Sequence, residues 1–342
     1  MKKKRIVLLF AVVLAAVYYV AAGRIETARS DTPLPGGVAA SASSPVVLTG
    51  VLMTDVRTLA SAPYAGRGTG SEGSKLAQAY IAQRFRELGL QPFGGSYLAP
   101  FSFTHKSIKR LFSAGTTYKV EYPAAANVVG YIKGSMDPNR YMVVSAHYDH
   151  LGVREGVTYP GADDNASGVA AMLAIAAHFR QHPPQHTVVF AAFDAEELGH
   201  RGAESFLNAL PFPRGQLAFN LNLDMVSRND SNEIWASGLY HNPALRSHVA
   251  GPASRSSVKV KLGHDKPMFL AGNVDDWTGQ SDHAQFHAAG VPYLYFGVAD
   301  HADYHGPGDT AAMINPAFFG KVTSLLIDVA VTADQGLQSI KP

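Results

Sequence analysis

The sequence predicts an α/β protein in which a mostly parallel central β-sheet is flanked by helices on both faces, in three layers. Strand-like runs alternate along the chain with helical segments, which is the order that builds a parallel sheet covered on both sides. Two of the strand runs, 187–193 and 292–298, are almost continuously apolar. Such runs are typical of parallel strands that are buried on both faces.

The elements follow one another in a regular order. Helices are expected at or within 74–88, 168–179, 196–210, 242–253, 282–289 and 316–333. Strands are expected at 126–133, 141–146, 187–193, 217–225, 233–237 and 292–298. The glycine-rich segment 66–70 is expected to be a flexible loop. Since ligands bind beyond the carboxyl ends of parallel strands, residues that follow these strands are the candidates for a site.

Composition excludes several kinds of chemistry. The chain has 342 residues, which is enough for two average domains or one large α/β domain. Of these residues 46% are hydrophobic, which is enough to build a sizeable core. It has no cysteine, so disulfides, thiolate catalysis and Cys-ligated zinc are excluded. Any zinc site must therefore use histidine and carboxylate ligands. The net charge of +2 gives no indication of a nucleic-acid partner.

The N-terminus predicts export. Basic residues at 2–5 precede an apolar run at 6–22 that ends in small residues, as in a secretory signal peptide. The run also approaches the length of a membrane span. We therefore expect 1–23 to be a cleaved signal peptide or an uncleaved membrane anchor, 24–46 to be a flexible linker, and 47–338 to form one periplasmic or extracellular domain.

A histidine stands where the strand 141–146 ends. His147 is followed two residues later by Asp149. A carboxylate at that spacing can accept the second N–H of the imidazole and fix its tautomer. Taken alone, however, a histidine here is more often a structural residue in a turn.

Two aspartates open the helix expected at 168–179. Asp163 and Asp164 are adjacent, and Asn165 and Ser167 follow. Helix capping alone explains Asn165 and Ser167 well. It explains the double aspartate less well, because two neighbouring like charges are costly without a cation.

The sharpest signal follows the buried strand 187–193. Glu196 and Glu197 are adjacent there, and neighbouring residues that leave a strand point in different directions. One glutamate can therefore bind a metal while the other faces water. The alternative is that both acids merely favour the N-terminus of the helix that follows.

Two more candidates lie farther along the chain. Asp224 stands at the apolar strand end of 217–225, where a buried carboxylate needs a partner. His305 lies in the glycine-rich loop 304–310. Two histidines and three carboxylates suit a pair of zinc-like ions, with Glu196 free to activate water. The five expected ligands are His147, Asp164, Glu197, Asp224 and His305.

The combined motifs resemble the M28 zinc aminopeptidases over roughly residues 50–335. They are His147-x-Asp149, the run 161–168, the glutamate pair, Asp224-Met225, the run 304–310 and the loop around Arg67. The resemblance implies the zinc exopeptidase (phosphorylase/hydrolase-like) fold, two Zn²⁺ ions per chain and a peptide substrate.

The family's ligand roles transfer to matching positions. The resemblance implies that His147 and Asp224 hold one zinc ion and that Glu197 and His305 hold the other. Asp164, rather than Asp163, would bridge the two ions, and the peptide bond that follows it is expected to be cis.

The resemblance also implies catalytic roles. Glu196 would be the general base acting on a metal-bound hydroxide, and Asp149 would support His147. Tyr304 resembles a tyrosine that steadies the oxyanion in some members of the family. The segment 281–283 is expected to be structural or pocket-lining, and the substrate pocket is expected to draw on 259–280, with Met268, Phe269 and Trp277.

An aminopeptidase that removes N-terminal residues is thus the leading hypothesis. Three alternatives stay open on the same fold. A glutaminyl cyclase would use one zinc ion, a dipeptidase or carboxypeptidase would use the same dinuclear chemistry on other peptides, and a receptor-like module would lack catalysis.

Overall fold

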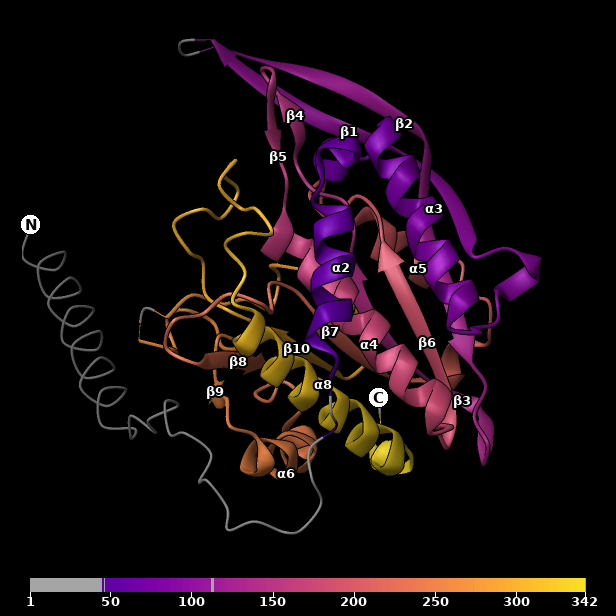
Figure 1. The fold of residues 1–342 in the computed structure, drawn as a ribbon. Helices are drawn as coiled ribbons and strands as arrows, with labels where there is room; N and C mark the ends of the chain where they lie inside the picture. Colours follow the sequence, from indigo (N-terminus) through magenta and orange to yellow (C-terminus); the bar gives the residue numbers. More distant parts are fainter. Residues whose placement is uncertain (1–44, 46, 112–113, 273, 342) are drawn as a thin grey trace, which may run out of the picture. The chain divides into compact units, whose positions relative to one another are not determined.

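The computed structural model describes residues 45, 47–111, 114–272 and 274–341 (Figure 1). They all belong to one compact unit of the chain, 33–342. The expected leader 1–23 lies outside the described residues, as does the expected linker 24–46 apart from Pro45.

An eight-stranded sheet forms the centre of this unit, in the order β1-β2-β6-β3-β7-β10-β8-β9. The inner strands β6, β3, β7 and β10 are parallel to one another, whereas β2 pairs antiparallel with β6 and β8 pairs antiparallel with β10. The predicted, mostly parallel sheet is therefore confirmed. The strands are β1 Leu98–Leu111, β2 Ala114–Ile132, β3 Asp137–His147, β6 His186–Phe193, β7 Leu217–Leu223, β8 Glu233–Ser237, β9 Lys259–Leu262 and β10 Tyr293–Gly297, with a separate β4–β5 pair at Gly152–Arg154 and Val157–Tyr159.

Helices cover both faces of the sheet, which gives the predicted three layers (Figure 1). Alternate strand residues divide between two apolar clusters: Val144 and Phe190 belong to the larger one, and Val143 and Val189 to the smaller one. The larger cluster is built with α2, α3, α4, α6 and α8, and the smaller with α5 and α7. These helices are α2 Thr49–Leu59, α3 Glu72–Glu87, α4 Gly168–Gln181, α5 Arg201–Asn208, α6 Arg246–Arg255, α7 His283–Ala288 and α8 Pro316–Gly336.

The C-terminal helix α8 is long and apolar enough to span a membrane by composition alone. Its apolar side chains have another explanation, because residues such as Phe319 and Leu326 are fully buried in the larger cluster. The helix also packs against α4 and α6. It is therefore accounted for as a core helix of the α/β layer.

Every expected helix and strand is present, but α2, β1, β9, the β4–β5 pair and the first part of β2 were not expected. The long hairpin of β1 and β2 extends well before the expected strand 126–133. β1 lies at the edge of the sheet and contains Pro100 and several basic residues. Proline and charge are common on edge strands and weaken the strand pattern in the sequence.

The expectation of a flexible loop at 66–70 was wrong for its first residues. They belong to a short helical turn, Ala62–Arg67, in which the Arg67 side chain is fully buried. Burial lowers the pKa of this guanidinium to about 10. Its N–H groups donate to four backbone carbonyls at 2.7–2.8 Å, those of Leu59, Tyr148, Pro160 and Gly161. Arg67 thus ties the segments after β3 and before α4 to the N-terminal part of the domain.

Candidate metal centre

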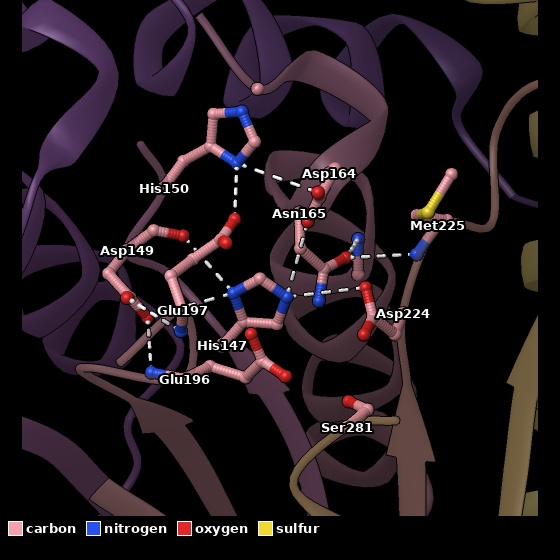
Figure 2. Close-up of polar contacts among 12 residues, drawn as sticks. His147, Asp149, His150, Asp164, Asn165, Glu196, Glu197, Asp224, Met225 and Ser281 are labelled. Carbon is pink, nitrogen blue, oxygen red and sulfur yellow. Dashed lines mark hydrogen bonds and ion pairs between the residues drawn. The ribbon is translucent and has the colours of Figure 1, made fainter. Parts of the chain in front are cut away.

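The carboxyl ends of the four parallel strands meet at one edge of the sheet, and each strand leads into a predicted site residue. His147 is the last residue of β3 and Asp224 directly follows β7. Glu197 lies four residues after β6, and His305 lies in the loop after β10. Asp164 comes from the turn that precedes α4. The structure therefore brings all five expected ligands together, and Figure 2 shows four of them.

One group of donor atoms surrounds His147. Its Nε2 lies 3.3 Å from Asp164 Oδ1 and 3.3 Å from Asp224 Oδ1. All three residues are buried. A tetrahedral zinc ion with bonds of about 2.0–2.1 Å separates its ligand atoms by roughly 3.3 Å. The group therefore fits a zinc ion.

A second group surrounds the other oxygen of Asp164. His305 Nε2 lies 3.2 Å from Asp164 Oδ2 and 3.4 Å from Glu197 Oε2. This spacing also suits a tetrahedral ion. Since Asp164 offers a different oxygen to each group, its carboxylate is placed to bridge two ions.

The buried carboxylates of the centre need positive charge beside them. Among the described residues, Asp164, Glu197 and Asp224 pair with histidines and with no Lys or Arg. Burial alone would raise the pKa of Asp164, but the histidines, chiefly His150, lower it well below its usual range. Hydrogen bonds to Asp164 and Glu197 raise the pKa of His305 to about 10. Bound metal ions would replace the protons on the histidines as the positive charge beside the carboxylates, because imidazoles bind metals in the neutral form.

Asp149 supports the centre in a different way from that expected. Its backbone carbonyl lies 3.1 Å from His147 Nδ1, whereas its carboxylate is 3.6 Å away. The carboxylate accepts the backbone N–H groups of Glu196 at 3.0 Å and of Glu197 at 3.3 Å. Asp149 therefore fixes His147 through its main chain and the glutamate pair through its side chain.

The two glutamates occupy different positions, as expected from their adjacency. Figure 2 shows the Glu197 carboxylate beside His150 and the Glu196 carboxylate apart from it. The Oε1 atom of Glu196 lies 3.2 Å from His200 Nε2. Burial raises the pKa of Glu196 well above its usual range, and the carboxylates of Asp224 and Glu197 raise it further.

The two aspartates before α4 also have different environments. Asp163 Oδ1 accepts from the Ser227 N–H at 2.9 Å and from its hydroxyl at 2.6 Å. It therefore faces away from the donor groups, as the family resemblance implied. The Asp164–Asn165 peptide bond is cis, and Asn165 Oδ1 accepts the Gly168 N–H at 2.9 Å, which agrees with the capping interpretation of Asn165.

Three buried residues near the centre received no individual role from the sequence. Asp309 accepts the backbone N–H groups of Asp163 and Asp164 at 3.0–3.1 Å, and so positions Asp164. Asp282, in the expected structural segment 281–283, is fully buried, and neither of its carboxylate oxygens has a hydrogen-bond partner among the described residues. His150 reaches the second donor group. Its position three residues after His147 was the only signal for it in the sequence.

A cavity of about 560 Å³ opens onto the donor groups. The expected pocket residues Met268 and Trp277 line it, whereas Phe269 is 83% exposed and does not. Carboxylates outside the donor groups also line it, and the described lining residues include no Lys or Arg. These additional carboxylates are those of Glu196, Asp275, Asp276 and Asp300. The cavity is therefore strongly anionic.

Fold and site together define an α/β protein with a candidate metal centre of histidines and carboxylates at the edge of its sheet. Residues 127–330 match the family described as Peptidase family M28. This match covers more than half of the chain. The chain therefore belongs to family M28, a family of zinc metallopeptidases.

Individual relatives are similar to the chain over shorter stretches or in fold alone. Aminopeptidase YwaD of Bacillus subtilis is 31% identical over 156 residues, which cover 45% of this chain and 31% of that protein. The chain spans about a quarter to a third of the length of the curated relatives that it first matches. The zinc aminopeptidase BSAP of B. subtilis has a TM-score of 0.66 at 17% identity, over 84% of this chain and 96% of that one.

A glutaminyl cyclase from Bacteroides thetaiotaomicron has a similar fold, with a TM-score of 0.62 at 16% identity, over 84% of this chain and 98% of that one. At such identities the likeness to both structures shows the fold alone.

Proposed function

We propose that the chain is a dinuclear zinc aminopeptidase that hydrolyses N-terminal residues from peptides. The observation that carries the proposal is the pair of donor groups that share Asp164 at the base of an anionic cavity. His147 and Asp224 would hold one ion, and Glu197 and His305 the other. When bound, the two zinc ions would polarise the scissile carbonyl and lower the pKa of water.

Glu196 is proposed as the general base. It would take a proton from the attacking water and later give it to the amine that leaves. A carboxylate suits both steps when its pKa is raised toward neutrality, and burial raises the pKa of Glu196. Both transfers use the same carboxylate, so Glu196 ends the cycle in its initial state.

The charge of the cavity favours an aminopeptidase over a carboxypeptidase or dipeptidase. A free α-amine is a cation and complements the carboxylates of Asp275, Asp276 and Asp300. A substrate bound through its α-carboxylate would favour a Lys or Arg side chain as its partner, and neither lines the described part of the cavity. Recognition of the amine by acidic groups therefore supports cleavage at the N-terminus.

A panel of aminoacyl chromogenic substrates tests this proposal. Substrates with a free α-amine should be cleaved, and their N-acetylated counterparts should not. Chelation should abolish cleavage and zinc should restore it. Conversion of N-terminal glutamine to pyroglutamate with one metal per chain would instead support the cyclase. Unchanged cleavage after complete metal removal would refute the proposal.

The variant Glu196→Gln tests the proposed base. It should lower kcat by about 10²–10⁴ and leave two zinc ions bound per chain. Glu204→Gln is the matched control, because Glu204 pairs with Arg201 on the surface of α5. A Glu196→Gln enzyme with ordinary turnover would remove the assignment.

Export is proposed from residues 1–23, which are basic and then apolar. The catalytic domain would lie in the periplasm or outside the cell, free or held by an uncleaved anchor. Cell fractionation followed by N-terminal sequencing of the protein distinguishes these outcomes, and recovery of the full-length chain from the cytosol would contradict export.

A further inference from the structure

We propose that His150 is a further metal ligand, which binds the ion held by Asp164, Glu197 and His305. The assignment rests on the proposed function for the presence of that ion. It adds a ligand from a different segment, since His150 lies in the loop after β3 and His305 in the loop after β10.

The geometry places His150 at the second donor group. Its Nδ1 lies 2.8 Å from Glu197 Oε1 and 3.6 Å from Asp164 Oδ2 (Figure 2). The His150 side chain is fully buried. Ligand atoms from His150, Asp164 and Glu197 all lie within 4.8 Å of one another, which is the arrangement that a single cation requires.

The contacts of His150 leave its ring only partly satisfied. Its Nδ1 forms a 2.8 Å ion pair with Glu197 Oε1, whereas its buried Nε2 has no hydrogen-bond partner among the described residues. Buried polar atoms without partners are rare and costly. His147, by contrast, has its Nδ1 on the Asp149 carbonyl. A cation bound by both His150 Nδ1 and Glu197 Oε1 would take the place of the proton between these two atoms.

The backbone leaves space for the His150 ring and holds it. Gly161 has a left-handed φ of +60°, and a Cβ there would lie 2.5 Å from His150 Cγ. Only glycine fits that position. Arg67 fixes the same glycine by donating to its carbonyl at 2.7 Å. The ring is therefore preorganised beside Glu197 before any ion binds.

The additional ligand makes the two ions unequal. The first would have His147, Asp224 and Asp164, which is the number of protein ligands typical of catalytic zinc sites with an open position. The second would have Asp164, Glu197, His305 and His150, which is the number found in closed structural sites. We therefore expect the ion at Glu197 to bind more tightly and to exchange more slowly than the ion at Asp224.

X-ray absorption at the zinc edge counts the imidazoles directly. Three ligating histidines shared by two zinc ions should give about 1.5 imidazoles per zinc in the wild-type protein. His150→Asn should lower the average to about 1.0, although Asn keeps an N–H near the position of Nδ1 and can still orient Glu197. A wild-type average near 1.0 that the variant leaves unchanged would overturn the assignment.

Metal affinity gives a second readout that does not depend on turnover. His150→Asn should weaken one of the two ions by at least about 10–100-fold in chelator competition and leave the other unchanged. His301→Asn is the matched control, because His301 Nε2 lies 3.3 Å from Asp163, outside the donor groups. It should change neither affinity.

The outcomes separate the two proposals. A wild-type protein that binds no zinc would refute the proposed function. Two bound ions with one imidazole each would refute the role of His150 alone. Circular dichroism and thermal unfolding of the metal-free variants show whether His150→Asn still folds, and the imidazole count of the wild-type protein decides the question even if it does not.

Discussion

The two halves of the proposed metal centre are built differently. The strand half, His147 and Asp224, stands at the ends of β3 and β7, with side chains 1% and 10% exposed. The loop half, Glu197 and His305, stands beyond the strands, and the His305 side chain is 39% exposed. The sheet ladder itself positions the strand half, whereas the loop half depends on side-chain and backbone hydrogen bonds.

In the loop half, individual hydrogen bonds take the place of the backbone hydrogen bonds of the β-sheet. The Asp149 carboxylate accepts the Glu197 N–H, and Asp309, four residues after His305, accepts the N–H groups of Asp163 and Asp164. His305 itself has a left-handed φ of +51°, which is uncommon outside glycine. The positions of the residues in the strand half are therefore set by the strands, whereas those in the loop half are set by contacts between loops.

Asp164 joins the two halves, so its loss should have the largest effect. Asp164→Ala removes both oxygens that face the two donor groups. We expect the affinity for both ions to fall by more than the roughly 10–100-fold that the loss of an outer partner costs, with activity lost. Chelator competition measures it, and retention of one ion at wild-type affinity would show that the halves are independent.

The halves should also differ in stability without metal. His147→Ala leaves the buried Asp164 and Asp224 carboxylates without their shared partner, which should cost about 3–5 kcal/mol. His305→Ala removes a partly exposed pair and should cost less than about 1 kcal/mol. Urea unfolding in EDTA measures both values, and equal losses would contradict the distinction.

Directly after β6, a buried acid should make stability depend on pH. Burial and the neighbouring Asp149 raise the pKa of Asp194 from 3.8 to about 7. Between these values the folded protein holds a proton that the unfolded chain has released, so stability falls as pH rises from about 4 to 7 and then levels off.

The variant Asp194→Asn isolates this contribution. Because Asn cannot titrate, the unfolding free energy of the variant in EDTA should fall less over this pH range than that of the wild-type protein. The difference between the two should reach up to about 4 kcal/mol, which corresponds to a pKa shift of about three units. Unfolding free energies at pH 4.5 and 8 test it. Parallel pH profiles for the wild-type protein and the variant would show that Asp194 does not carry the effect.

The smallest expected effect concerns which half supplies the oxyanion donor. Tyr304 stacks on His305 with ring centroids 4.0 Å apart and belongs to the loop half. Tyr304→Phe keeps the ring and should lower kcat by about 100-fold, with metal content unchanged. Tyr295→Phe is the comparison, because Tyr295 donates to the Asp224 carbonyl at 3.4 Å. A loss confined to Tyr295→Phe would assign the donor to the strand half.

The residues of the strand half could be predicted from the sequence more directly than those of the loop half. His147 and Asp224 could be identified because the apolar runs before them mark buried strands, and strand ends define an edge. Asp164, Glu197 and His305 needed the family motifs as well, since loops carry no periodicity. His150 and Asp309 were missed because only three-dimensional contacts distinguish them from other polar loop residues. The β1–β2 hairpin was missed because proline and charge obscure its alternation.

Arg67 has a consequence for the minimal active unit. It lies upstream of the family match at 127–330, yet it holds the carbonyls of Tyr148 and Gly161, next to residues of the centre. A fragment that begins at residue 127 would retain every proposed ligand but lose the Arg67 hydrogen bonds that hold the segments next to those ligands. Any proteolytic maturation that preserves zinc binding must therefore cut before Leu59, whose carbonyl is a further anchor of the same guanidinium.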